Sequence, residues 1–523
     1  MFNIITEGLV RMTVADEGRS ASLPEVFAAL MRDEVKTFPA LRPHQRHAWH
    51  AFLVQLGAMA MVQASVSEPP ENATEWADLI RGLTSDYSDD EPWQLVVEDI
   101  TKPAFMQPPA SSKDKEKEFK NTVTTPDELD MLVTAKDHDL KAAVAKRASV
   151  DDWIFALITL QTMEGFGGAG NYGISRMNGG LGSRPAFSLV PEGGPGAHVK
   201  RDIVALLEHR SAMLDTYPMT DNGAALLWTL PWDGTSVQAL LVSQLDPFYI
   251  EVCRRIRLGS DANGEVQGIR ASSKAARVKS KEMKGRMGDP WTPVDLKGEK
   301  SLTLATGGFT YKRVADYLTS PDWERPTLLR PTHAEQGSAE TMQLVARAMV
   351  RGQGKTEGYY ERTIPIKRKT KMALLHRART QDLGDIAQAR IERVGTVQRI
   401  LSHAIQTFAA RGDSDKISPE HRKLSRPWLN QLDAIVDARF FDDLQTEFEA
   451  DESARGSIQN EWLLNVVVAA ARRILHAAED ALSCPAIQRY RARVAAEGLF
   501  EGRLRGNQGL PFLFTEEGDE DDS

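Results

Sequence analysis

Hydrophobic and polar residues follow two different patterns in the two parts of the chain. Between residues 343 and 366 they alternate around a polar, glycine-rich centre, which is typical of a long β-hairpin. From residue 372 onward, apolar residues recur every three or four positions. This spacing predicts amphipathic helices over residues 372–410, 428–448 and 458–482, followed by a shorter helix over 485–497.

These patterns predict an α+β protein. We expect a mixed α/β N-terminal domain over residues 1–367, followed by an all-α four-helix bundle over residues 368–505. Residues 506–523 end in a run of acidic residues and are expected to form a disordered tail. No internal repeat is visible.

Local signals place several elements of the first domain. Ser22, followed by Pro24 and Glu25, predicts a capped helix start. A second helix opens near Pro43 and carries three histidines at a spacing of three residues, His44, His47 and His50. Such a spacing is compatible with metal ligands, but histidines there also cap a helix or face solvent, so we predict no metal site.

The most unusual segment is EGFGGAGNYGISRMNGGLGSR, residues 164–184, which holds eight glycines. Glycine reaches positive φ cheaply and lets another backbone approach closely, but it loses much entropy on ordering. Apolar runs flank the segment on both sides, which favours a held loop over a free linker. It is either a surface cluster of turns or a backbone surface shaped for a phosphate, a sugar or a base edge.

Composition limits the possible partners. The chain has 523 residues, a formal net charge of −9 and two cysteines, Cys253 and Cys484. An acidic molecule binds nucleic acid only through local basic patches, and residues 270–286 carry seven basic residues against one acid. This basic run is either a solvated face or a phosphate-binding strip. We expect a reducing, cytoplasmic location, because no secretory signal and no membrane-spanning apolar run is present.

Two segments resemble nucleotide-binding motifs, but the residues around each of them do not fit the motif. GFGGAG, residues 165–170, fits the dinucleotide fingerprint, but the glycine-rich residues after it are unsuited to the required helix. GQGKT, residues 352–356, ends like a phosphate loop, but Met349 stands where that motif needs glycine. A nucleotide-binding enzyme is therefore the alternative hypothesis. No convincing catalytic set of residues and no cofactor motif is present.

Several pieces of the chain, taken in order, resemble one family. They are FNIITEGLVRM, RPHQRHAWHAFLVQLGAMA, KPAFMQPP, TAKDHDLK, QTMEGFGGAGNYGISRMNGGLGSRP, LLWTLPWDG, RGQGKTEGYYER and RFFDDLQTEFE. Their order over residues 1–500 is similar to CasA, the large subunit of the type I-E Cascade complex of CRISPR interference. The resemblance implies a non-enzymatic subunit of a ribonucleoprotein. Such a subunit inspects double-stranded DNA for the protospacer-adjacent motif (PAM), helps open it for guide-RNA pairing and supports recruitment of a helicase-nuclease.

The resemblance also assigns residues. Its glycine loop falls on Gly165, Gly167 and Gly168, and its PAM-contacting lysine on one of Lys279, Lys281 and Lys284. The strand-separating hairpin falls on Gln353, Gly354, Lys355 and Thr356, where either Gln353 or Thr356 takes the place of the wedge residue. The loop that docks near the 5′ handle of the guide RNA falls on Lys136, His138 and Lys141.

The chain departs from the family at two places. Some relatives carry a cysteine cluster, read as a zinc site, after the piece that matches LLWTLPWDG, whereas only Cys253 lies nearby here. We therefore predict no zinc. The tip of the hairpin also differs, which leaves open the PAM sequence that is read. A purely structural scaffold remains the third hypothesis.

Overall fold

The computed structural model describes residues 2–130, 148–338, 340–352, 355–374 and 377–514. The chain forms two compact units. The first consists of Met1–Phe309 and Pro321–Ile366, and the second of Thr310–Ser320 and Lys367–Ser523. Every helix in the described ranges is too short or too polar to traverse a lipid bilayer.

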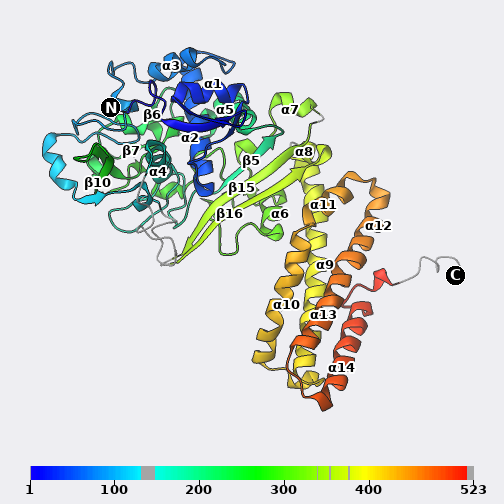
Figure 1. The fold of residues 1–523 in the computed structure, drawn as a ribbon. Helices are drawn as coiled ribbons and strands as arrows, with labels where there is room; N and C mark the ends of the chain where they lie inside the picture. Colours follow the sequence, from blue (N-terminus) through cyan, green and yellow to red (C-terminus); the bar gives the residue numbers. More distant parts are fainter. Residues whose placement is uncertain (1, 131–147, 339, 353–354, 375–376, 515–523) are drawn as a thin grey trace. The chain divides into compact units, whose positions relative to one another are not determined.

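The first unit mixes helices with small sheets (Figure 1). Its helices are α1 (Leu23–Met31), α2 (Arg46–Ala64), α3 (Ala73–Gly82), α4 (Val150–Thr162), α5 (Pro195–Thr216) and α7 (His333–Gly337). Its strands are β1 (Val10–Val14), β2 (Glu17–Ala21), β3 (Val35–Thr37), β4 (Asn121–Val123), β5 (Ala186–Pro191), β6 (Ala224–Leu226), β7 (Leu240–Leu241), β8 (Leu245–Ile250), β9 (Arg255–Ser260), β10 (Val266–Ala271), β11 (Val278–Lys279), β12 (Val294–Asp295), β13 (Lys300–Ser301), β14 (Trp323–Glu324), β15 (Met342–Gly352) and β16 (Lys355–Ile366).

Helix α2 forms the centre of this unit because it is apolar on almost every side. A helix of that kind is stable only when it is covered all round. Helices α3, α4 and α5 and strand β8 pack against it. The predicted start of α1 is confirmed: the Ser22 hydroxyl accepts from the Glu25 amide at 3.4 Å, and the Glu25 carboxylate accepts from the Ser22 amide at 2.7 Å.

The predicted hairpin is also confirmed. Strands β15 and β16 pair in antiparallel register from Met342 and Ile366 to Gly352 and Lys355, with one irregularity after Val350. Strand β5 pairs with the other edge of β15, which makes a three-stranded sheet. Figure 1 shows β15 and β16 running side by side along their length.

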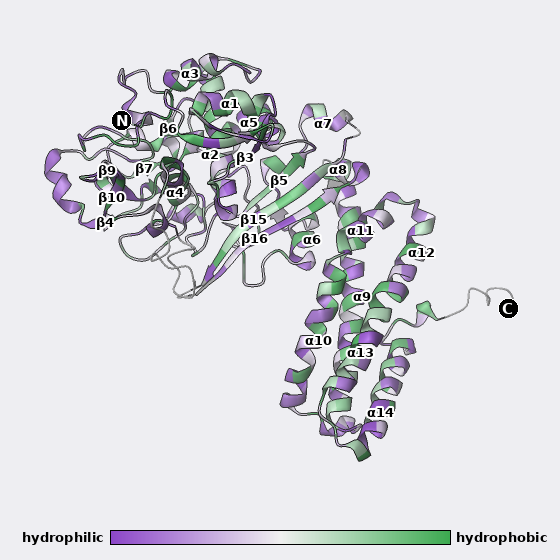
Figure 2. Ribbon diagram, in the orientation of Figure 1, coloured by the Kyte–Doolittle hydropathy of each residue, from purple (hydrophilic) through white to green (hydrophobic). Residues whose placement is uncertain are grey.

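The second unit is helical. It contains α6 (Tyr311–Thr319), α8 (Arg368–Ala373), α9 (Arg377–Ala409), α10 (Pro419–Asp437), α11 (Phe440–Glu449), α12 (Glu452–Trp462), α13 (Ala469–Ala481) and α14 (Ala486–Arg505), with a π-helical segment, Leu463–Val468, between α12 and α13. Helix α9 is the central element, and α6, α8, α10, α11, α13 and α14 contact it. Figure 2 shows hydrophobic and hydrophilic residues alternating along these helices, as the sequence pattern predicts.

The fold class is therefore confirmed as α+β with a C-terminal helical region, but some predicted helix ends are wrong. Helix α10 begins at Pro419, where the Ser418 hydroxyl caps it, and it continues through Pro427. The predicted helix over residues 428–448 is divided into α10 and α11. Proline lacks an amide hydrogen and disfavours a helix interior, so the sequence pattern placed the break at the wrong position.

Candidate nucleic-acid interface

The glycine-rich segment folds back on itself directly after α4. The amides of Gly165 and Phe166 donate to the carbonyls of Gly182 and Gly180, at 3.0 and 3.1 Å. A Cβ atom on Gly165 would lie 2.2 Å from the Gly180 oxygen, so a side chain there forces the two halves of the segment apart. The base of the loop thus requires glycine for close backbone approach.

The tip of this loop is an exposed turn. Gly167 donates to the Asn171 carbonyl at 2.8 Å, and Asn171 donates to the Gly168 carbonyl at 3.0 Å. Gly168 and Gly170 have φ of 107° and 84°, which favours glycine at both positions. Within the described residues, the three amides from Gly168 to Gly170 have no acceptor. The tip therefore carries three successive unbonded donors, and the Ala169 methyl group is the one side chain that these three residues possess.

A buried arginine, Arg254, stabilises the loop by hydrogen bonds to its backbone. The Arg254 guanidinium donates to the Gly165 carbonyl at 3.0 Å and to the Tyr172 carbonyl at the other end of the loop. The Gln161 side chain fixes Arg254 in turn, since its amide group bonds both the amide and the carbonyl of Arg254, at 2.8 and 2.9 Å. The loop is thus ordered by contacts within the protein before any ligand binds.

Glu164 lies beside this arginine in the same buried layer. Its carboxylate is 3.7 Å from the Arg254 guanidinium. Burial raises the pKa of Glu164 to about 7, although the charge of Arg254 opposes that shift. One Glu164 carboxylate oxygen has no hydrogen-bond partner among the described residues. Glu164 is therefore a group at the base of the loop that changes protonation near neutral pH.

The loop is fastened to the hairpin. The Ser183 amide donates to the Met349 carbonyl at 3.1 Å, and the Ser183 hydroxyl accepts from the Met349 amide at 2.6 Å. Gly182, with φ of 108°, lies so close that a Cβ there would be 2.9 Å from the same Met349 oxygen. The glycine loop and the outer part of β15 are consequently joined three residues before β15 ends at Gly352.

The tip of the hairpin is described only in part. Gln353 and Gly354 lie outside the described residues, whereas Lys355 and Thr356 are placed as the first residues of β16. The register pairs Gly352 with Lys355, so two residues connect the strands. A phosphate loop needs a helix after its Gly-Lys-Thr. Here Lys355 and Thr356 begin strand β16 instead of a helix, which contradicts a phosphate loop at this motif.

The basic run meets the glycine segment at both of its ends. At one end, the Ser273 amide donates to the Gly170 carbonyl at 3.1 Å, and the Tyr172 hydroxyl donates to the Lys274 carbonyl at 3.2 Å. At the other end, a Cβ on Gly285 would lie 2.6 Å from the Met177 carbonyl carbon. The run is therefore part of the same surface as the loop.

The three candidate lysines are exposed and differ in position. Lys284 directly precedes Gly285, so its backbone adjoins the glycine segment. Lys279 ends β11, which pairs with β7, and Lys281 begins a short 3₁₀ turn, Lys281–Met283. In the described ranges, none of the three ammonium groups forms an ion pair. Three exposed cations thus lie on one short stretch of chain, and Lys284 is the one next to the contact with Met177.

One member of the basic run belongs to the core. Arg277 is buried, and its guanidinium donates to the carbonyls of Pro231, Gln238 and Leu230 at 3.0 to 3.1 Å. Burial lowers the pKa of Arg277 to about 10. Reading the whole run as one solvated or phosphate-binding strip is therefore wrong at this position. The remaining candidates for the guide-RNA loop, Lys136, His138 and Lys141, lie outside the described residues.

A cluster that the sequence did not reveal joins His50 to residues of α5. His50 Nε2 and His198 Nε2 lie 2.8 and 3.2 Å from one oxygen of Asp202, and burial lowers the pKa of His198 to about 4. The two imidazole rings are stacked, with centroids 3.9 Å apart and planes inclined by 25°. The other oxygen of the same carboxylate accepts from the Arg201 guanidinium at 2.9 Å, so both oxygens of Asp202 already have hydrogen-bond partners within the protein. We therefore interpret the cluster as a hydrogen-bonded part of the core. The i, i+4 spacing of His198 and Asp202 was its signal in the sequence.

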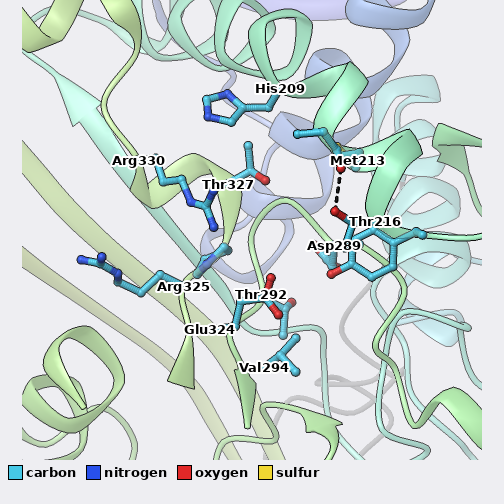
Figure 3. Close-up of a pocket in the computed structure, with 14 residues that line it drawn as sticks. His209, Met213, Thr216, Asp289, Thr292, Val294, Glu324, Arg325, Thr327 and Arg330 are labelled. Carbon is cyan, nitrogen blue, oxygen red and sulfur yellow. Dashed lines mark hydrogen bonds between the residues drawn. The ribbon is translucent and has the colours of Figure 1, made fainter. Parts of the chain in front are cut away.

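A separate pocket of about 80 Å³ lies beside α5 in the first unit. Figure 3 shows His209 and Thr216 of α5 on one side, with Thr327 and Arg330 facing them. Glu324 and Arg325 add charges of both signs to the lining. None of the glycine segment or the hairpin lines this pocket, so it is not part of the candidate interface.

The architecture defines the class of protein. Solved structures of the CRISPR-associated proteins Cse1 and CasA share the fold. The Cse1 protein of Acidimicrobium ferrooxidans is 15% identical with a TM-score of 0.63, covering 96% of this chain and 97% of that one. CasA (Cse1) of Thermus thermophilus is 16% identical with a TM-score of 0.63, covering 96% and 98%. Cse1 of Thermobifida fusca is 15% identical with a TM-score of 0.59, covering 98% and 99%.

The sequence itself also matches a family model. The model for CRISPR-associated protein Cse1 covers residues 3–473. No sequence among the curated proteins matches the chain. The chain thus belongs to the Cse1 family, also called CasA, the large subunit of the type I-E Cascade complex of CRISPR defence. The resemblance drawn from the sequence is confirmed.

Proposed function

We propose that this subunit recognises the PAM in double-stranded target DNA and helps to open the duplex for guide-RNA pairing. One observation carries the proposal: an exposed loop tip with three successive free amides is hydrogen-bonded, through Ser183, to the outer part of a long hairpin. The loop and the hairpin therefore act on DNA as one body. The described residues of the two parts hold no set of groups arranged for covalent chemistry, which supports a binding role.

The loop tip suits the minor groove. Base pairs present acceptors there, adenine N3 and thymine O2, with a guanine amino group as the one added donor. Backbone amides from Gly168 to Gly170 are donors, and the absence of bulky side chains at the tip lets them approach a narrow groove. The exposed Lys279, Lys281 and Lys284 supply charge for the phosphates beside it.

The hairpin suits the opening step. Once the loop is seated on the motif, the fixed link at Met349 holds the tip, including Gln353, Gly354, Lys355 and Thr356, against the next base pairs. Favourable contacts at the motif then offset the few kcal/mol that unstacking a base step requires. Guide RNA pairs with the separated strand, and base pairing reads the remaining sequence.

Further partners follow from family membership. We propose that Lys136, His138 and Lys141 contact the 5′ handle of the guide RNA, that other Cascade subunits surround the chain, and that the assembled complex recruits the CRISPR helicase-nuclease. The helical second unit is the candidate for contacts with neighbouring subunits.

The test uses the assembled complex with guide RNA. Wild type and Gly168→Asp complexes are titrated with two targets, a full duplex carrying a functional PAM and the same target with the guide-matched region already unpaired. A carboxylate at the tip repels the groove, so we expect the variant to lose duplex binding and to keep most of its affinity for the open target. Equal duplex binding by the two complexes contradicts the proposal.

A further inference from the structure

Phe166 places an aromatic ring beside the otherwise nearly bare loop tip. Phe166 is 38% exposed, although Gly165 before it is buried. The ring lies 5.9 Å from the Tyr172 ring, centroid to centroid, at an angle of 55°. The Tyr172 hydroxyl is bonded to the Lys274 carbonyl at 3.2 Å, which holds this second ring in place. The protein thus keeps an apolar surface in water at the edge of the candidate interface.

The backbone around Phe166 is fixed on every side. Its own amide donates to the Gly180 carbonyl at 3.1 Å, the carbonyl of Gly165 accepts from Arg254 at 3.0 Å, and the amide of Gly167 is used within the turn. The Cα atom of Phe166 therefore stands at a set position relative to the free amides from Gly168 onward. Little backbone entropy remains to be lost when this segment meets a ligand.

We propose that Phe166 packs against the deoxyribose wall of the minor groove beside the loop tip, and thereby makes this contact selective for DNA over RNA. The inference rests on the proposed function and names the sugar as a second feature that the loop reads. The tilted contact with the Tyr172 ring backs Phe166 on one side, which favours packing against the groove wall over insertion between base pairs.

Sugar selectivity follows from the chemistry of the groove. The C–H surface of deoxyribose is apolar and matches an aromatic ring. Ribose adds a 2′-hydroxyl that is displayed in the minor groove of an RNA helix. Pressing that hydroxyl against Phe166 removes it from water without giving it a hydrogen-bond partner, which is unfavourable.

The expected size of the effect follows from the exposed surface. An aromatic side chain offers about 200 Å², of which 38% is exposed here, so roughly 75 Å² is available for burial. Complete burial of that area strengthens binding by up to about 20-fold.

The experiment is a ribonucleotide scan. Target duplexes carry one ribonucleotide at a time through the PAM, on either strand, and are titrated with the guide-loaded complex. For wild type, we expect one or two adjacent positions at which ribose weakens binding several-fold. Phe166→Ala should bind all-DNA targets up to about 20-fold more weakly and should lose the sensitivity to ribose at those positions. Phe512→Ala is the matched control, since Phe512 is 41% exposed and lies in the helical unit.

Two outcomes overturn the inference. One is a wild-type scan without any position sensitive to ribose, which needs no variant at all. The other is a Phe166→Ala complex with the wild-type affinity or the wild-type ribose profile. Both differ from failure of the proposed function, in which Gly168→Asp binds the full duplex as wild type does.

Discussion

Gly168→Ala separates binding from folding at the loop tip. Gly168 has φ of 107°, and a Cβ built there meets no atom within 4 Å. The added methyl group therefore points into open space, and the folded protein bears only the strain of an L-residue at positive φ. That strain amounts to about 1–2 kcal/mol, which lowers the melting temperature by a few degrees in a unit of this size.

The expected loss of DNA binding is larger. In the proposed complex the same methyl group lies between the backbone and the floor of the groove, so the amides at positions 168 to 170 no longer reach the base edges. Losing one or two hydrogen bonds at about 1 kcal/mol each predicts a loss of roughly 5-fold to 30-fold in duplex affinity. Binding to a target that is already unpaired should change little.

The controls are two other glycines of the first unit. Gly264 also has positive φ, 81°, and open space around its Cβ position, but it lies in the β9–β10 turn. That turn lies before the start of β10, whereas Ser272, which adjoins Gly170, follows the end of the strand. The length of β10 therefore separates the turn from Ser272 by roughly 20 Å. Gly165→Ala, with its Cβ 2.2 Å from the Gly180 oxygen, should instead disturb the fold itself.

The assay combines thermal unfolding of each variant subunit with titration of each assembled complex against the PAM-containing duplex. Gly168→Ala and Gly264→Ala should unfold at similar temperatures and differ in duplex affinity. If both variants bind the duplex equally well, the tip does not touch DNA and the assignment of the loop is refuted.

Three further predictions test the surroundings of the loop. Ser183→Ala removes the 2.6 Å hydrogen bond from the Met349 amide, so we expect the free energy of unfolding to fall by about 1 kcal/mol. Binding to the full duplex should weaken, whereas binding to the open target should not. If the ratio of the two affinities stays at the wild-type value, the coupling of loop and hairpin is contradicted. The pKa of Glu164 is raised from 4.5 to about 7, so between these pH values the folded state holds a proton that the unfolded state releases. The free energy of unfolding should therefore fall by up to about 3 kcal/mol as pH rises from 4.5 to 7. Chemical denaturation of Glu164→Gln should lack this decline, and a pH profile identical to that of wild type argues against the role of the buried carboxyl group. Reversing the charges of Lys279, Lys281 and Lys284 should weaken duplex binding and reduce its salt dependence by about one phosphate contact for each lysine that touches DNA. Reversing the charge of the exposed Lys36 on β3 should change neither the affinity nor the salt dependence. A salt slope equal to that of wild type excludes the three lysines from the interface.

The sequence by itself determined the parts of this protein that depend on local pattern. Alternation over residues 343–366 predicted the β15–β16 hairpin, and helical spacing predicted the long helices of the second unit. Ser22 and Glu25 predicted the start of α1. Such features are legible because periodicity and capping act between neighbours along the chain. Pro427 shows the limit of this reasoning, since α10, which packs against α9, continues through this proline.

Only the tertiary structure decided how the candidate interface is assembled. Arg254 supports the glycine loop from a position 89 residues further along the chain, and Met349 is bonded to Ser183 across 166 residues. The fold also brings Gly285 of the basic run against Met177 of the glycine-rich segment and buries Arg277 from the same run. These pairings follow from burial and from the hydrogen bonds that buried polar groups require. Neither leaves a periodic signal in the sequence, because the partners meet only when the core has formed.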